Sequence, residues 1–210
     1  MNTLWLRLQR LYWRRRVRDP ALRALLGQSL AFTRQPFARR RFVVMDLETT
    51  ALDPQQGEIV SIGWVVIENA RIRLDQARHY HLSPTQGVGQ SAIFHQLTDS
   101  DLEQAHDFPQ VMPSLIAALH NSTLVFHNAA LDLGFLNRYL RRQAGAPLLV
   151  PVLDTLRLEY QRLQRRKAAL ETGDLRLGTC RHRYGLPELA AHDALTDALA
   201  TAELLLAMEG

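Results

Sequence analysis

Residues Phe42 to Leu52 read FVVMDLETTAL and carry the clearest structural signal in the sequence. The apolar start of this stretch, as far as Leu47, predicts a buried strand. Asp46 and Glu48 stand two residues apart at the end of that strand, so both side chains should project from the same face. Two adjacent carboxylates repel each other, and without a cation one of them would keep its proton at a raised pKa. The stretch therefore predicts a core strand that ends in a cation-binding pair.

Two later segments carry chemistry of the same kind. Residues 124–136 read LVFHNAALDLGFL and place Asp132 on a helix that follows an apolar strand. Residues 191–198 read AHDALTDA and hold His192 and Asp197 near the start of the last helix. Carboxylates from three segments are ligands of the kind that hard cations such as Mg²⁺ or Mn²⁺ prefer. Enzymes that hydrolyse phosphodiesters commonly use a pair of such ions about 4 Å apart. His192 is the side chain suited to take a proton from water near neutral pH. The sequence therefore predicts a nuclease.

In chain order the three segments present D-x-E-T-T, then H-N-A followed by an aspartate, and then H-x-x-x-x-D. Three motifs in this order and at this spacing resemble those of the DEDDh exonuclease family, which includes the proofreading epsilon subunit of bacterial DNA polymerase III. The resemblance covers Arg41 to Met208, most of the chain. It implies an α/β domain with the ribonuclease-H-like fold, a mixed five-stranded sheet flanked by helices.

The resemblance also implies a reaction. A two-metal-ion 3′–5′ exonuclease of this kind releases nucleoside 5′-monophosphates from the 3′ end of DNA, in proofreading or repair. Two divalent cations, Mg²⁺ or Mn²⁺, are the implied cofactors. The implied metal ligands are Asp46, Glu48, Asp132 and Asp197, and the implied general base is His192.

Recognition of a 3′ end requires further residues. In the resembling family, the backbone after the first-motif glutamate contacts the 3′-hydroxyl, and an apolar side chain a few residues on wedges against the last bases. Thr49 and Leu52 occupy those positions here. Asn128 is either a substrate contact or the N-cap of the following helix. The family usually has glycine where this chain has Ala51, and alanine tolerates a positive φ poorly, which predicts a differently shaped loop.

Two other interpretations of the function stay open. RNA could replace DNA as the substrate, as in relatives that trim small RNAs. A different class is a non-catalytic nucleic-acid-binding or polymerase-associated module built on the same fold. The presence of all five predicted catalytic side chains argues against that second interpretation.

Periodicity, turn residues and caps predict the remaining elements. A tight turn is expected at Asn69–Ala70. Strands are expected at Phe42–Leu47, Glu58–Glu68, Arg71–Leu82, Thr123–His127 and Val150–Leu153. Helices are expected at Asp99–Ala105, Pro109–His120, Ala129–Gln143, Thr155–Lys167, Leu175–Tyr184 and Pro187–Met208.

We expect structural roles for some side chains near the motifs. Asp154 is expected to cap the helix that starts at Thr155, and Phe94 is expected to pack in the core. His127 ends a predicted strand, where a structural role is favoured. The arginines at 138, 141 and 142 lie on one predicted helix, where they could follow a phosphate backbone or form a solvated face.

Charge divides the chain in two. Residues 1–41 hold eleven arginines and one acidic residue, Asp19, whereas the rest of the chain has a net charge of −6. We therefore divide the chain into a basic amphipathic N-terminal extension, residues 1–40, and an exonuclease domain, residues 41–210. The extension could pack on the domain or stay unordered, contact nucleic acid, or form a membrane-surface helix or presequence. The expected partners are nucleic acid 3′ ends and, through the extension, a polymerase or another protein.

Composition sets the remaining limits. Of the 210 residues, 47% are hydrophobic, which is ample for a core. Cys180 is the one cysteine, so an internal disulfide and a cysteine-based zinc site are excluded. No apolar run approaches the ~18 residues that a membrane span requires, and the sequence starts without a secretory signal. These observations predict a cytoplasmic protein with no integral membrane association.

Overall fold

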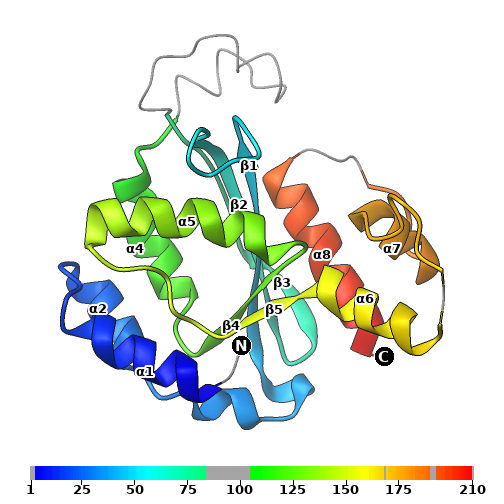
Figure 1. The fold of residues 1–210 in the computed structure, drawn as a ribbon, viewed down its shortest axis with the longest axis horizontal. Coiled ribbons are helices and arrows are strands. Elements are labelled where there is room, and N and C mark those ends of the chain that lie inside the picture. The colour runs from blue at the N-terminus through cyan, green and yellow to red at the C-terminus, as the bar shows by residue number, and fades with distance from the viewer. Residues whose placement is uncertain (1–2, 84–104, 168, 190–192, 210) are drawn as a thin grey trace.

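The computed structural model describes residues 3–83, 105–167, 169–189 and 193–209 (Figure 1). Phe94 and His192 lie outside the described residues, and so does nearly all of the helix predicted at Asp99–Ala105. None of the described helices is both long and apolar enough to cross a membrane.

A single five-stranded sheet forms the centre of the described chain. Its strands are β1 (Arg41–Thr49), β2 (Ile59–Glu68), β3 (Arg71–His81), β4 (Ser122–Phe126) and β5 (Val152–Asp154). Their order is β3-β2-β1-β4-β5. The pairs β1–β2 and β2–β3 are antiparallel, whereas β1–β4 and β4–β5 are parallel. The predicted mixed five-stranded sheet is therefore confirmed.

Helices cover both faces of this sheet (Figure 1). In chain order they are α1 (Thr3–Arg14), α2 (Pro20–Gly27), α4 (Phe108–Ala118), α5 (Ala129–Ala144), α6 (Thr155–Arg165), α7 (Leu177–Arg183) and α8 (Ala194–Glu209). Two short 3₁₀ turns, Ala31–Arg34 and Phe37–Arg39, lead from α2 into β1. Figure 1 shows α4 and α5 on one side of the sheet and α6 and α8 on the other.

Alternation along β1 creates two cores. Val43 and Met45 belong to the larger cluster, which includes buried side chains of α2, α4 and α5. Phe42 and Val44 belong to a smaller cluster with Ala202 and other residues of α8. A strand buried on both faces needs apolar residues at successive positions, and the run from residue 42 to residue 45 supplies them.

The hairpin between β2 and β3 has the predicted tight turn. Asn69 and Ala70 both have positive φ values, 53° and 54°. Such values at both central residues are typical of a two-residue hairpin turn, whose twist matches that of the strands.

The N-terminal extension packs on the domain. Leu22 and Leu25 of α2 are fully buried and belong to the larger core. The backbone N–H of Arg18 donates to the carbonyl of Ala144 at the end of α5, at 2.8 Å. Of the alternatives for this segment, packing on the domain is the one that the described residues display.

The predicted boundaries of the described elements differ from the observed ones by at most two residues, except at the start of the last helix, where the prediction is wrong. The last helix starts at Ala194, and residues 186–189 have no regular structure. Asp193 provides the physical reason, because its side chain accepts the N–H of Thr196 at 2.8 Å and so acts as the N-cap. The strand predicted at Val150–Leu153 instead spans Val152–Asp154, because Pro151 has no N–H to donate to a ladder.

Candidate functional site

The end of β1 presents two carboxylates on the face that looks toward α8. Phe42 and Val44 are buried on that face, and strand alternation places Asp46 and Glu48 on the same side. Both carboxylates are partly buried. A register shift between Glu48 and Thr49 interrupts the pairing with β2, so the regular ladder ends where the carboxylates emerge.

A glycine allows α8 to reach this pair. Gly63 of β2 lies opposite Asp46 in the sheet. A Cβ atom at Gly63 would lie 2.3 Å from the backbone nitrogen of Leu195 and 2.4 Å from the carbonyl carbon of Ala194. Glycine within a strand often marks such a close approach of another backbone. The first turn of α8 therefore rests directly on β2, and this contact brings Asp197 to the end of β1.

Three of the predicted metal ligands converge. Ligand oxygens of Asp46, Glu48 and Asp197 all lie within 4.8 Å of one another. One cation could contact all three at this spacing. Carboxylate oxygens are hard donors of the kind that Mg²⁺ and Mn²⁺ prefer. The donor set and its geometry therefore fit a divalent cation.

Asp132 reaches the same end of the sheet from the first turn of α5. It is only 4% exposed. Strand β4 pairs with β1 only as far as Val44, so the regular sheet pairing on this side of β1 stops before Asp46. Burial raises the pKa of Asp132 to about 7, although hydrogen bonds from Leu47 and from its own backbone act in the opposite direction.

The carboxylates perturb one another strongly. Burial raises the pKa of Asp46 well above its usual range, and repulsion from Asp132 and Asp197 raises it further. Glu48 and Asp193 act in the same direction. A cation among these groups would favour their charged forms and so relieve the repulsion.

The start of α8 is held to the sheet one residue from His192, which itself lies outside the described residues. Oδ2 of Asp193 accepts hydrogen bonds from both the N–H and the hydroxyl of Thr196. Oδ1 of Asp193 lies 3.6 Å from Nε2 of His79, and that nitrogen is 2.7 Å from the Ser61 hydroxyl oxygen. Side chains of β2 and β3 therefore anchor Asp193 and the start of α8.

Asp154 joins the first turns of two helices. Its Oδ1 accepts the N–H of Leu156 at 3.0 Å, which confirms the predicted cap of α6. The same carboxylate accepts the N–H groups of Asn128 and Ala129, both at 3.1 Å. Asp154 thereby fixes the start of α5, the helix turn that carries Asp132.

Asn128 does not make the predicted capping hydrogen bond. It stands at the N-cap position of α5, but its side chain bonds to no backbone N–H of the helix. Its φ of 78° is left-handed, whereas a capping residue usually has an extended backbone. The contact of Asn128 with substrate stays a prediction.

His127 has a structural environment, as the sequence predicts. Its Nδ1 lies 2.9 Å from the Thr155 hydroxyl oxygen, and its Nε2 lies 2.8 Å from the Leu175 carbonyl oxygen. Both ring nitrogens are thus engaged within the protein, between β4, α6 and the segment before α7.

The loop after β1 exposes a leucine four residues after Glu48. Leu52 is 81% exposed, and the Thr49 hydroxyl donates to the Ala51 carbonyl at 2.9 Å. Ala51 is not among the described residues with a positive φ. The loop therefore has a conformation that alanine allows, and the substrate contacts of Thr49 and Leu52 stay predictions.

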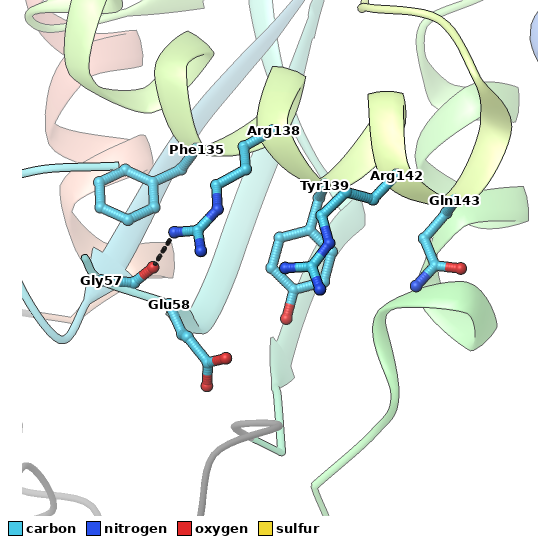
Figure 2. Close-up of a pocket in the computed structure, with 7 residues that line it drawn as sticks. All are labelled: Gly57, Glu58, Phe135, Arg138, Tyr139, Arg142 and Gln143. Atoms are coloured by element: carbon cyan, nitrogen blue, oxygen red, sulfur yellow. Dashed lines mark hydrogen bonds between the residues drawn. The ribbon is translucent and has the colours of Figure 1, made fainter. Parts of the chain in front are cut away.

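Two of the three arginines on α5 have partners within the protein. Figure 2 shows Arg138 extending from α5 to the segment before β2, in a small pocket of about 100 Å³. It donates to the carbonyls of Gly57, at 2.9 Å, and of Pro54. The guanidinium of Arg141 lies 5.2 Å from the ring centroid of Trp13. These contacts favour a role of Arg138 and Arg141 in holding the loop and the N-terminal extension over a role in following a phosphate backbone.

A larger hollow adjoins the carboxylates. It has a volume of about 570 Å³ and lies between α7 and α8, with Asp197 in its wall. Arg176 and His182 contribute to the lining. The described residues thus leave open space next to the proposed cation ligands.

Comparison with known families gives one clear match. A sequence profile of the family RNase_T, described as exonuclease, matches residues 43–205. That range includes all five predicted catalytic residues.

Curated relatives agree with this match. The chain is 35% identical over 171 residues to a PolC-type DNA polymerase III of Thermotoga petrophila, and 33% identical over 189 residues to that of Thermotoga maritima. These alignments cover 81% and 90% of this chain but only 12% and 13% of the relatives. The chain thus corresponds to about an eighth of each polymerase.

Solved structures share the fold. The structure of the cell-death related nuclease CRN-4 superposes with a TM-score of 0.64 at 17% identity, covering 82% of this chain and 64% of that one. Escherichia coli exonuclease I in complex with a dA16 oligonucleotide superposes with a TM-score of 0.65 at 14% identity, covering 81% and 41%. At these identities the likeness concerns the fold alone. The profile, by contrast, spans most of the sequence, and by that match the chain belongs to the RNase_T exonuclease family.

Proposed function

We propose that the chain is a metal-dependent 3′–5′ exonuclease that releases nucleoside 5′-monophosphates from the 3′ end of DNA. The observation that carries the proposal is the convergence of Asp46, Glu48 and Asp197 within 4.8 Å. Family membership supports hydrolysis of a nucleic acid chain from an end. The direction, the preference for DNA and the number of metal ions are parts of the proposal.

The four carboxylates would hold two divalent cations, Mg²⁺ or Mn²⁺. Asp46, Glu48 and Asp197 would bind one, and Asp46 would share the other with the substrate phosphate, with Asp132 close by. Such ions supply Lewis-acid stabilisation of the charge that develops on the phosphate.

The chain's own residues would then perform the proton transfer and the positioning. His192, with an ordinary pKa of about 6.5, takes a proton from the attacking water. The water oxygen bonds to the terminal phosphorus, and the bond from phosphorus to the 3′ oxygen of the preceding nucleotide breaks. Asp193, which is held by His79 and caps α8 through Thr196, would limit how far the neighbouring His192 can move during this step.

Exposure of Leu52 supports the proposed choice of a chain end. An apolar side chain that is 81% exposed, four residues after Glu48, can wedge against the last bases of a strand. Thr49, at the end of β1, would place its backbone against the 3′-hydroxyl.

The proposed partner, besides DNA, is a polymerase. The curated relatives are named as DNA polymerases, and the chain matches a small part of each, which supports a role in proofreading. The single cysteine of the chain is free and buried, which supports a reducing, cytoplasmic location.

A gel-resolved digest of 5′-labelled DNA and RNA single strands of equal sequence tests this proposal. We expect a ladder that shortens from the 3′ end of DNA in Mg²⁺ or Mn²⁺ and is absent with EDTA. Asp46→Ala should lower the rate more than the 10–100-fold that is typical for loss of an outer-shell partner of a metal. Asp75→Ala is the matched control, because Asp75 is an exposed aspartate of β3 outside the cluster.

Each other result overturns a defined part of the proposal. Faster cleavage of RNA than of DNA would overturn the substrate, and release of label as a mononucleotide would overturn the direction. No cleavage of either strand with any metal would overturn the enzymatic function and favour a binding module.

A further inference from the structure

The outward face of α1 is apolar. The large side chains on this face are at least half exposed, whereas the other exposed large hydrophobic residues in the described ranges are scattered. The exposed fractions are 63% for Leu4, 56% for Trp5, 52% for Leu8, 56% for Leu11 and 51% for Tyr12. At 100° per residue these five positions fall within an arc of about 120°. Contiguous exposed apolar patches of this kind usually mark a surface that binds something.

The opposite side of α1 is fixed to the domain. Leu6 and Arg10 are each only 4% exposed. The Arg10 guanidinium donates to the carbonyls of Leu25 at 2.7 Å, Leu26 at 3.0 Å and Gln28 at 2.9 Å. These carbonyls belong to the last turn of α2 and the residue after it, so Arg10 ties α1 to the end of α2. The outward face is therefore presented on a fixed helix.

Arginines surround the outward face, and no acidic residue precedes Asp19 in the sequence. The exposed arginines in α1 and directly after it are Arg7, Arg14, Arg15, Arg16 and Arg18. The Arg16 guanidinium stacks over the ring of Tyr12, at 3.6 Å from its centroid. The face thus combines apolar side chains, two aromatic rings with polar tips and a border of positive charge.

The outward face lies away from the carboxylates. Figure 1 shows α1 at the bottom of the view and the first turn of α8, which carries Asp197, in the upper half. A partner on α1 would thus leave the carboxylate cluster accessible.

We propose that the outward face of α1 docks the protein on an anionic lipid surface. Leu4, Leu8 and Leu11 would enter the boundary between headgroups and acyl chains, with Trp5 and Tyr12 at the interface. The arginines would meet lipid phosphates. An in-plane helix with leucine and tryptophan on one face and arginines beside it is typical of such binding. The proposal is independent of the nuclease activity.

Charge complementarity and apolar burial together select this occupant. Nucleic acid phosphates would engage the arginines but would leave the leucines against a polar backbone. A protein partner could bury the leucines and pair with the arginines only if it had an apolar groove of matching length with an acidic rim. An anionic bilayer offers both features at any place on its surface.

Sedimentation with vesicles tests the proposal. The full chain would be mixed with vesicles of phosphatidylcholine alone or with about one quarter phosphatidylglycerol, and we expect binding to the anionic vesicles only, weakening with added salt. Leu8→Glu with Leu11→Glu should lower the partition coefficient by more than about tenfold, because two charges enter the apolar face. Leu74→Glu is the matched control, since Leu74 is 65% exposed on β3, and it should bind as wild type does.

Two further measurements separate docking from a folding defect. Arg7→Gln with Arg15→Gln alters only exposed side chains and should weaken binding to anionic vesicles several-fold. Tryptophan emission should shift to the blue on binding, and Trp5→Phe should remove most of the shift, because Trp64 is buried and Trp13 packs against the larger core on the other side of α1. Thermal unfolding should be the same for wild type and all these variants.

Four results would overturn the proposal. The first is that wild type does not bind anionic vesicles at low salt, and the second is that Leu74→Glu loses as much binding as Leu8→Glu with Leu11→Glu. The third is that wild type forms a dimer in solution and that Leu8→Glu with Leu11→Glu dissociates it. The fourth is that this double variant loses binding to DNA while wild type does not bind vesicles at all. The third would make the face an interface between copies of the chain, and the fourth a nucleic acid contact.

Discussion

The two ends of the molecule break the usual rule of apolar inside and polar outside in opposite ways. At the end of β1 the protein buries carboxylates, with Asp132 at 4% exposed, and at α1 it exposes a row of large apolar side chains. Each arrangement is unfavourable without a partner: a cation in the first case and an apolar phase in the second. The buried carboxylates and the exposed apolar face thus coincide with the two places where we propose that this protein binds other molecules.

The two ends are also held together differently. At the carboxylate end, the position of each acidic side chain depends on backbone contacts, namely the approach of α8 to Gly63 and the Asp154 cap on two helices. At the α1 end the buried guanidinium of Arg10 and the packing of Leu6 hold the helix to the domain. Substitutions at the first end should therefore alter activity, whereas substitution of the residues that anchor α1 should alter stability without altering activity.

Gly63→Ala is expected to have the largest effect. The new Cβ would meet the backbone of α8 at 2.3 Å, so α8 and Asp197 must move. Displacements of about 1 Å in a catalytic group can cost 100-fold in rate, and overpacking should cost about 3 kcal/mol of stability. Exonuclease assays and urea unfolding would measure both.

Gly178→Ala is the control for that substitution. Gly178 lies in α7, and a Cβ there would meet nothing within 4 Å. We expect its rate and stability to stay close to those of wild type. Equal activity of Gly63→Ala and Gly178→Ala would contradict the view that Gly63 sets the position of Asp197.

Arg10→Met should come next, with an effect on stability alone. It leaves the carbonyls of Leu25 and Leu26 without their charged donor, and such losses typically cost about 2–3 kcal/mol. Arg7→Met, an exposed arginine of the same helix, should change stability by less than about 0.5 kcal/mol. Denaturant unfolding would measure both. A loss of nuclease rate in Arg10→Met as large as that in Gly63→Ala would break the division between the two ends.

Asp154→Ala should destabilise more than Asp19→Ala. Asp154 accepts N–H groups from the first turns of two helices, whereas Asp19 accepts the N–H of Leu22 and caps α2 alone. At about 1 kcal/mol for each cap, we expect losses of about 2 and 1 kcal/mol in thermal or urea unfolding. Only Asp154→Ala should also slow the exonuclease, because it loosens the turn that carries Asp132. Equal losses of stability would show that one of the two caps of Asp154 contributes nothing.

Much of the carboxylate end could be predicted from sequence because its signals are local. The apolar run before Asp46 predicts the strand, and strand alternation predicts that Glu48 shares its face. Gly63 had a signal too, since a lone glycine in the run from Ile59 to Glu68 suggests a close backbone approach. The second cap made by Asp154 had none, because it joins residues that are distant in sequence.

The α1 end was harder to predict for a different reason. Apolar residues lie on two sides of the helix, so its sequence shows an amphipathic pattern without showing which side packs. Arginines lie on both sides as well, and nothing local marks Arg10 as the buried one. The start of α8 was misjudged because Pro187 resembles a first helical residue, while the cap that acts is Asp193.

The effect of Asp132→Asn on the stability of the metal-free protein should depend on pH and should vanish near pH 4. The pKa of Asp132 is raised to about 7 by burial, against about 3.9 in an unfolded chain. Between these values the native protein binds a proton that the unfolded chain does not, so the stability of the metal-free protein falls as pH rises from 4 to 7. Asparagine removes this loss. The metal-free variant should therefore melt a few degrees above wild type at pH 8 and at the same temperature near pH 4.

Mg²⁺ should raise the melting temperature of wild type more than that of Asp132→Asn, because the variant lacks one carboxylate. Asp75→Asn, at an exposed position, should show no gain at pH 8. A gain in Asp132→Asn that is independent of pH would mean that burial of the Asp132 charge is not what destabilises the empty site.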